Sequence, residues 1–138
     1  ARLKAAGLKE IGRVIDLLPG LGVRRRPPLI GWVFSEVWAK SDPMKIQSFL
    51  RSLRAAKTIL ENSDAEWERI KPVTKAKNNT TFLALRKAYR LGIPQSFGDE
   101  DVAAAETLFK VLAKYGGKDL VGNSTTLTPG TFWSGFRY

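Results

Sequence analysis

The most regular hydrophobic pattern in the chain follows Asp42 and Pro43. Asp42 is a good N-cap, and Pro43 suits the first helical position because its missing N–H costs nothing there. Apolar residues then recur at the three-and-four spacing of one helix face, at Ile46, Phe49, Leu50, Leu53, Ile59 and Leu60. The pattern predicts an amphipathic helix of about five turns. We expect Phe49 and Leu53 on its buried face, and the basic residues Lys45, Arg51, Arg54 and Lys57 largely facing water.

Two further helices are predicted by their capping residues. Ser63 and Glu66 form a capping box that starts a helix anchored by Trp67 and Ile70, which Pro72 ends or kinks. Asn79 caps the next helix, whose apolar residues and stop signals follow at Phe82, Leu85, Tyr89, Gly92 and Pro94.

A fourth helix is predicted after Gly98, where three carboxylates fill the first turn, at Asp99, Glu100 and Asp101. Carboxylates there complement the positive end of the helix dipole. We interpret them as structural rather than as a metal site, because no second acidic cluster follows at calcium-loop spacing. The helix is expected to run to Tyr115 and to end at Gly116 and Gly117.

Two apolar stretches are too short for helices and favour strands. Residues 29–34 read LIGWVF and suit a buried strand, and residues 11–15 suit a second one before the turn at Pro19 and Gly20. The chain is therefore expected to be mainly α with two or three short strands. An exposed apolar edge invites pairing, so we expect residues 29–34 to be covered by the aromatic tail (residues 127–138) or paired with a second copy.

Composition indicates a folded chain that lacks the usual catalytic side chains. Its 138 residues suit a single domain, and its apolar content of 43% supplies a core. No apolar run approaches the ~20 residues of a membrane span, so no direct membrane insertion is expected. Without Cys or His there is no thiol nucleophile, Ser-His-Asp triad or usual zinc site. We predict that the chain is not an enzyme and uses no cofactor or metal.

The net charge of +10 is the unusual bulk property. Its tightest basic cluster is Arg24, Arg25 and Arg26, which two prolines follow, so the cluster belongs to a loop rather than to a recognition helix. We expect these arginines to be exposed and replaceable, and nucleic acid not to be the partner. A basic nucleic-acid-binding module and a helical partner-binding domain stay open as alternatives.

Three segments taken in order carry a family resemblance: LIGWVFSE, SDPMKIQSFLRS and SDAEWERIKP. Together they resemble the C-terminal portion of periplasmic ABC-transporter solute-binding proteins of the nitrate, taurine, aliphatic-sulfonate and thiamine-pyrimidine-precursor type. The similarity extends from about Ala1 to Trp133. It implies an α/β parent fold of the periplasmic-binding-protein type II kind. Residues 1–14 would end its second lobe, residues 15–28 would form a hinge crossing, and residues 29–138 would belong to its first lobe.

The same resemblance implies a function and a location. A protein of this family captures a small organic or anionic solute and delivers it to ABC permease subunits. It is periplasmic, or lipid-anchored outside the cell in a Gram-positive host. The family's N-terminal lobe and most of its second lobe are not in this sequence, and Ala1 to Lys4 reads like the end of a helix, so we expect a piece of a longer protein that carries part of a ligand site.

Candidate ligand contacts lie where the predicted strand meets the next helix, because ligands of open α/β sheets bind beyond strand carboxyl ends and beside helix N-termini. Trp32 can wall or stack on a solute, and Ser35 and then Glu36 open the helix. Alternation along a strand puts Trp32 and Phe34 on one face and Gly31, Val33 and Ser35 on the other, so only one set can face a cleft. The alternative is that the aromatic residues are core and Ser35 is only an N-cap.

Overall fold

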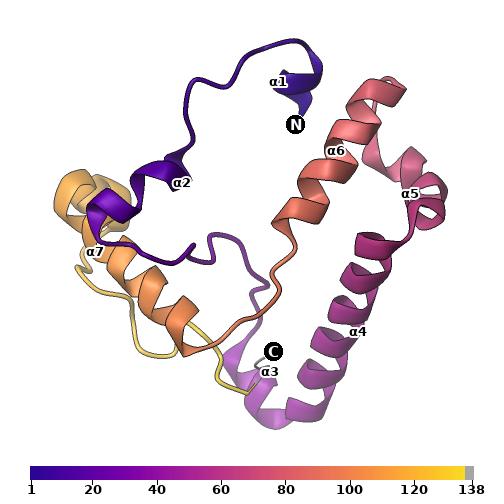
Figure 1. Cartoon of the computed structure of the whole chain (residues 1–138). Helices are drawn as coiled ribbons and strands as arrows, with labels where there is room; N and C mark the ends of the chain where they lie inside the picture. The colour runs from indigo at the N-terminus through magenta and orange to yellow at the C-terminus, as the bar shows by residue number, and fades with distance from the viewer. Residues whose placement is uncertain (136–138) are drawn as a thin grey trace. The chain divides into compact units, whose positions relative to one another are not determined.

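The computed structural model describes residues 1–135, and this part of the chain is mainly helical (Figure 1). Its elements in order are α1 (Arg2–Ala5), α2 (Val14–Leu17), the 3₁₀ turn η1 (Pro19–Leu21), α3 (Glu36–Ser41), α4 (Pro43–Asn62), α5 (Asp64–Ile70), the 3₁₀ turn η2 (Lys71–Thr74), α6 (Asn79–Gly92) and α7 (Asp99–Val121). Residues 1–135 contain no strand, so the two or three expected strands are not formed. Within the same residues, every helix is too short or too polar to cross a bilayer.

The chain forms two compact units. Unit 1 consists of Ala1–Ile11 and Met44–Gln95, and unit 2 consists of Gly12–Pro43 and the described part of Ser96–Tyr138. Each unit is therefore built from two stretches of sequence that lie far apart.

The core of unit 1 is aromatic. Phe82 of α6 and Ile46 of α4 are fully buried, and Trp67 of α5 is nearly so. The Trp67 ring packs edge-on against two rings of α6, with centroid distances of 6.3 Å to Phe82 and 5.3 Å to Tyr89. Edge-to-face packing of this kind adds to the benefit of burying Trp67 and Phe82, while Tyr89 stays 41% exposed. Trp67 therefore links α5 to both turns of α6 that face it.

The buried stripe of α4 differs from the predicted one. Phe49 is 40% exposed and Ile59 is also exposed, whereas Leu50, Leu53 and Leu60 are half-buried along with Lys57. The reason is geometric: starting from Ile46, the buried stripe follows positions 50, 53, 57 and 60. Phe49 precedes Leu50 by one residue, which turns its side chain about 100° around the helix. Lys57 lies on the stripe because its aliphatic stem can be covered while its ammonium stays wet.

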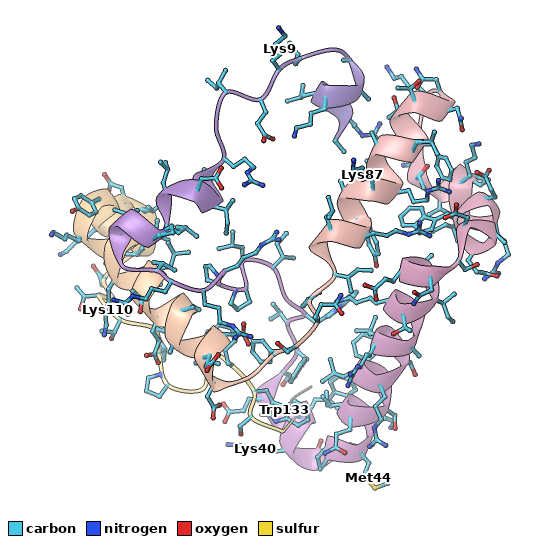
Figure 2. All side chains as sticks on the ribbon, viewed as in Figure 1. Lys9, Lys40, Met44, Lys87, Lys110 and Trp133 are labelled. Carbon is cyan, nitrogen blue, oxygen red and sulfur yellow. The ribbon has the colours of Figure 1, made fainter. Side chains whose placement is uncertain are left out.

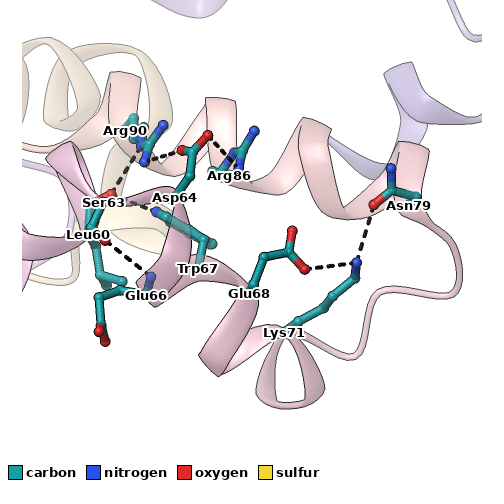
Figure 3. A network of polar contacts seen from close by, with 10 residues as sticks. All are labelled: Leu60, Ser63, Asp64, Glu66, Trp67, Glu68, Lys71, Asn79, Arg86 and Arg90. Atoms are coloured by element: carbon teal, nitrogen blue, oxygen red, sulfur yellow. Dashed lines mark hydrogen bonds and ion pairs between the residues drawn. The ribbon is translucent and has the colours of Figure 1, made fainter.

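One carbonyl group joins α4, α5 and α6 (Figure 3). The Leu60 carbonyl oxygen, near the end of α4, accepts from Trp67 Nε1 at 2.6 Å and from Arg90 Nε at 3.0 Å. Asp64 lies 3.1 Å from Arg86 Nη1 and 2.8 Å from Arg90 Nη2, the latter an ion pair too bent to count as a hydrogen bond. The last carbonyl groups of a helix have no hydrogen-bond partner within it. One of these in α4, the Leu60 carbonyl, is satisfied by two side-chain donors.

Ser63 starts α5 as predicted, and Asn79 is replaced as a cap by its neighbour. Ser63 Oγ accepts from the Glu66 backbone N–H at 3.2 Å, while the Ser63 N–H still donates to Ile59 of α4. In α6 the N-cap is Asn78, whose Oδ1 accepts from the Thr81 N–H at 2.8 Å, and the helix begins at Asn79. Either asparagine can cap, and the sequence pattern does not separate two adjacent ones.

Unit 2 packs α2 and η1 against α7. Leu18, Val23 and Ala104 are buried together, and Ile15 and Leu108 pack against them. The strand predicted for residues 11–15 is wrong, because Val14–Leu17 forms a helical turn in which Arg13 and Asp16 pair. Helical geometry puts Ile15 and Leu18 on the same face, whereas a strand would have separated them.

The prediction that the helix after Gly98 ends at Gly116 and Gly117 is correct for the uninterrupted part of α7. The described helix extends to Val121, but Gly117 interrupts it with φ of 59° and ψ of −160°. A positive φ is readily adopted by glycine. The helix therefore breaks at the pair of glycines and resumes for one further turn.

The strand predicted for residues 29–34 is also wrong for this structure. The segment has no regular secondary structure, and Leu29, Ile30, Trp32 and Val33 are exposed. A strand needs a neighbour to accept and donate its ladder hydrogen bonds. The described chain supplies none, so an apolar sequence alone does not form a strand here. We call residues 29–34 the apolar segment.

Candidate functional site

The candidate site is the junction at which the apolar segment enters α3 in unit 2. Ser35 is the N-cap of α3, and its Oγ accepts from the Trp38 backbone N–H at a long 3.4 Å. The cap leaves the Ser35 hydroxyl exposed at the start of the helix. At that position an incoming acceptor meets both a hydroxyl donor and the positive end of a short helix dipole.

Glu36 follows in the first turn and is already paired. Its Oε1 lies 2.6 Å from Lys40 Nζ one turn later, and both side chains are largely exposed. The hydrogen bond from Lys40, reinforced by its charge, lowers the pKa of the Glu36 carboxyl. Glu36 is thus ionised at neutral pH, with a flexible cation beside it. The pair presents both signs of charge next to Ser35.

The two aromatic residues of the segment have different surroundings. Trp32 is 60% exposed, so a large part of its indole is accessible. Phe34 is half-buried, and its ring meets Trp133 edge-on at 5.6 Å between centroids. The aromatic tail therefore does return onto the segment at its Phe34 end, while Leu29 and Ile30 stay exposed. Of the tail residues expected to cover the segment, 136–138 lie outside the described residues.

The three predicted ligand contacts thus come together as an exposed group. Trp32, Ser35 and Glu36 lie within five consecutive positions, and each is exposed. They expose an indole ring, a hydroxyl group and the Glu36–Lys40 ion pair in one short stretch of chain. Pairing with a second copy of the chain remains a prediction.

The best-built polar cluster of unit 2 was missed by the sequence analysis. Arg25 Nε and Nη2 donate to the two carboxylate oxygens of Asp101 at 2.6 and 3.2 Å. Arg25 Nη1 lies 2.6 Å from Glu100 Oε2, and Nη2 is 3.0 Å from Ser96 Oγ. Asp101 is buried, and it also accepts from the Gly98 N–H at 2.8 Å. Of these contacts, only the hydrogen bond between Gly98 and Asp101 at the start of α7 joins near neighbours, so only that one could be predicted from a local sequence pattern.

The electrostatics of this cluster favour the ionised carboxylate. Burial alone would raise the pKa of Asp101, but the hydrogen bonds from Arg25 and from the Gly98 backbone outweigh it and lower that pKa. Asp101 in turn raises the pKa of Arg25. The arginine is exposed, as predicted, yet its charge is committed to two carboxylates. The cluster is therefore structural, holding the loop before the apolar segment onto the start of α7.

A shallow hollow of about 190 Å³ lies beside this cluster. It is lined by Gly22, Val23, Arg24, Arg25, Glu100, Ala103, Ala104 and Thr107. In residues 1–135 no three acidic, His or Cys side chains are grouped closely enough to hold a metal ion. The junction of Trp32, Ser35 and Glu36 is kept as the candidate site because of the side chains that it exposes. No protein-family model, curated protein or solved structure matches the chain.

Proposed function

We propose that this chain is part of the solute-binding component of an ABC importer, which captures a small organic or anionic solute and delivers it to the membrane permease. The proposal starts from the resemblance carried by LIGWVFSE, SDPMKIQSFLRS and SDAEWERIKP. It includes the two-lobed α/β parent fold of that family and its periplasmic or lipid-anchored location.

The observation that supports it best is the exposure of the apolar segment. Leu29, Ile30, Trp32 and Val33 are all exposed, although they form the most apolar run before α4. Fully burying one such side chain is worth about 1.5–3 kcal/mol. A segment with that much to gain, ending at a Ser-capped helix, fits a strand of a larger sheet whose other strands belong to the rest of the parent protein.

Within that parent, the junction would lie at the carboxyl end of a strand, where open α/β sheets bind ligands. Trp32 would wall the apolar part of the solute, and the Ser35 hydroxyl would donate to its anionic group. The Glu36 carboxylate suits an amino group, as a zwitterionic aminosulfonate carries. These roles use no covalent chemistry, in keeping with a receptor.

One of the two grounds for a nucleic-acid-binding module is weaker in this structure. That alternative was motivated by the net charge of +10 and by the cluster of Arg24, Arg25 and Arg26, and the charge of Arg25 is neutralised by Asp101 and Glu100. A phosphate approaching Arg25 would have to displace two short ion pairs.

The test is isothermal titration of the chain with taurine, an alkanesulfonate, nitrate and a phosphorylated pyrimidine. We expect saturable one-to-one binding of at least one solute, abolished in Trp32→Ala and weakened in Ser35→Ala. Tyr115→Ala is the matched control, because it removes another exposed aromatic ring from unit 2, 71% exposed against 60% for Trp32. Binding of none of the four solutes, or equal loss in the control, contradicts the proposal.

A further inference from the structure

The positive charge of the chain is concentrated in unit 1. Its two stretches, Ala1–Ile11 and Met44–Gln95, contain 14 Lys and Arg residues against 5 Asp and Glu, a net charge of +9. The two stretches of unit 2 contain 9 against 8, a net charge of +1. The net positive charge is therefore distributed unevenly between the two units, although they are similar in size.

Most carboxylates of unit 1 are used within it. Glu10 pairs with Lys4, Asp64 with two arginines, Glu66 with Arg69, and Glu68 with Lys71. Residues 69–98 contain seven basic residues and no acidic one. Cations such as Lys75, Lys77 and Lys9 outnumber the one remaining carboxylate of unit 1, Glu61, which accepts a hydrogen bond from Gln95.

Two exposed segments carrying these lysines are tied together. The Arg2 guanidinium donates to the carbonyl oxygens of Thr74 at 3.1 Å and of Lys75 at 3.4 Å, which fixes α1 beside the end of η2. After α1 the chain folds back, and the Leu8 N–H donates to the Leu3 carbonyl at 3.1 Å. Figure 2 shows Lys9, the next residue, directed outward from the loop.

Exposed aliphatic side chains accompany the lysines on both segments. Leu3 is 69%, Leu8 58% and Val73 79% exposed. We call the group formed by Leu3, Leu8, Lys9, Val73, Lys75 and Lys77 the basic-apolar end of unit 1. Its composition differs from that of a merely solvated face, because aliphatic side chains gain nothing from contact with water.

We propose that the basic-apolar end of unit 1 docks on an anionic phospholipid surface. Lysines close to such a surface each contribute about 1 kcal/mol of attraction. The aliphatic side chains add to this by entering the boundary between headgroups and acyl chains, as interfacial segments do. The protein lies on the bilayer and does not span it. The inference depends on charge and exposure in unit 1 and not on the solute site.

Lipid fits this end better than nucleic acid. Readers of single strands stack bases on aromatic side chains, and the six residues of this end include none. Duplex readers insert a helix or ribbon into a groove, whereas these residues come from the four-residue helix α1, the 3₁₀ turn η2 and the loops that follow them. Three exposed aliphatic side chains have a favourable place in a bilayer interface and none on a phosphate backbone.

The test is co-sedimentation of the chain with phosphatidylcholine vesicles, with and without phosphatidylglycerol, at physiological salt. We expect binding only when phosphatidylglycerol is present. The variant Lys75→Gln/Lys77→Gln should weaken it about 25-fold, since each 1 kcal/mol is about fivefold. Val73→Ser, which changes no charge, should weaken binding as well, and this effect is not expected of a purely electrostatic partner.

The matched control is Lys110→Gln/Lys118→Gln, which removes the same charge from exposed positions of α7 in unit 2. It should bind the vesicles like the unmodified chain, because neither lysine belongs to the basic-apolar end of unit 1. Circular dichroism verifies that every variant is folded. Equal binding to both vesicle types, equal loss in the control, or tighter binding to duplex DNA that depends on the same lysines would each overturn the proposal. Solute titration is a separate readout, so either proposal can fail without the other.

Discussion

Arg25 and Asp101 form a two-pronged ion pair across 76 residues of sequence, with Nε to Oδ1 at 2.6 Å and Nη2 to Oδ2 at 3.2 Å. Parallel guanidinium–carboxylate bonds of this kind fix direction as well as distance. Because Asp101 is buried and also caps Gly98, the pair fastens the chain before the apolar segment to the first turn of α7.

The first prediction concerns the three neighbouring arginines. Arg25→Gln should lower the thermal unfolding midpoint clearly, because it leaves a buried carboxylate without its cation. Arg24→Gln and Arg26→Gln should each change stability by less than about 0.5 kcal/mol, as exposed residues usually do. Calorimetric scans of the three variants make the comparison. Equal midpoints for all three would mean that the pair contributes nothing, and that the whole cluster is replaceable as the sequence suggested.

A pH dependence follows from the same carboxylate. The folded-state pKa of Asp101 lies below its ordinary value of 3.8. The stabilisation is therefore fully present above that value, and it is lost as pH falls through the lower folded-state pKa. Urea unfolding at pH 7 and near pH 3 should show a smaller loss of stability for Asp101→Asn than for the unmodified chain. An unchanged pH dependence in the variant would assign the acid sensitivity to other carboxylates.

The exposure of Phe49 on α4 is tested by comparison with Phe82, the fully buried phenylalanine of α6. Phe82→Ala should cost about 3–5 kcal/mol, because a fully buried ring leaves a cavity against Trp67. Phe49→Ala should cost much less, because the ring is already 40% exposed. Chemical denaturation gives both values. Similar costs for the two would restore Phe49 to the buried face.

The position of the α6 cap is tested in the same way. Asn78→Ala should lower stability by about 1 kcal/mol, the usual cost of losing an N-cap. Asn79→Ala is the control, since Asn79 occupies the first helical position instead. A larger loss at Asn79 would return the cap to the position that the sequence pattern favoured.

The sequence predicts local structure well and non-local structure poorly in this chain. The helix beginning at Pro43, the cap at Ser63 and the stop at Gly92 are set by neighbours within a few residues, and all three were predicted. A strand at residues 29–34 depends on other strands, which no local pattern supplies. The Arg25–Asp101 pair joins residues 76 positions apart, and Asp101 carried only a helix-capping signal.

The candidate site follows the same rule. Trp32, Ser35 and Glu36 are close because they are neighbours in sequence, and the cap at Ser35 was predictable from its position before Glu36. The Glu36–Lys40 pair is the ordinary four-residue spacing on a helix. The contact of Phe34 with Trp133 joins the two stretches of unit 2, which are far apart in sequence, and only the aromatic composition of the tail indicated it.

Solute binding at the junction is measured most directly by an NMR titration that follows the Trp32 indole N–H and the backbone amides of Ser35 and Glu36. The family resemblance predicts that a sulfonate, nitrate or pyrimidine solute shifts these three signals together along one saturable curve. The indole signal of Trp67, which belongs to unit 1, serves as an internal reference and should stay in place. Unchanged signals at Trp32, Ser35 and Glu36 up to saturating concentrations of every solute would contradict the account.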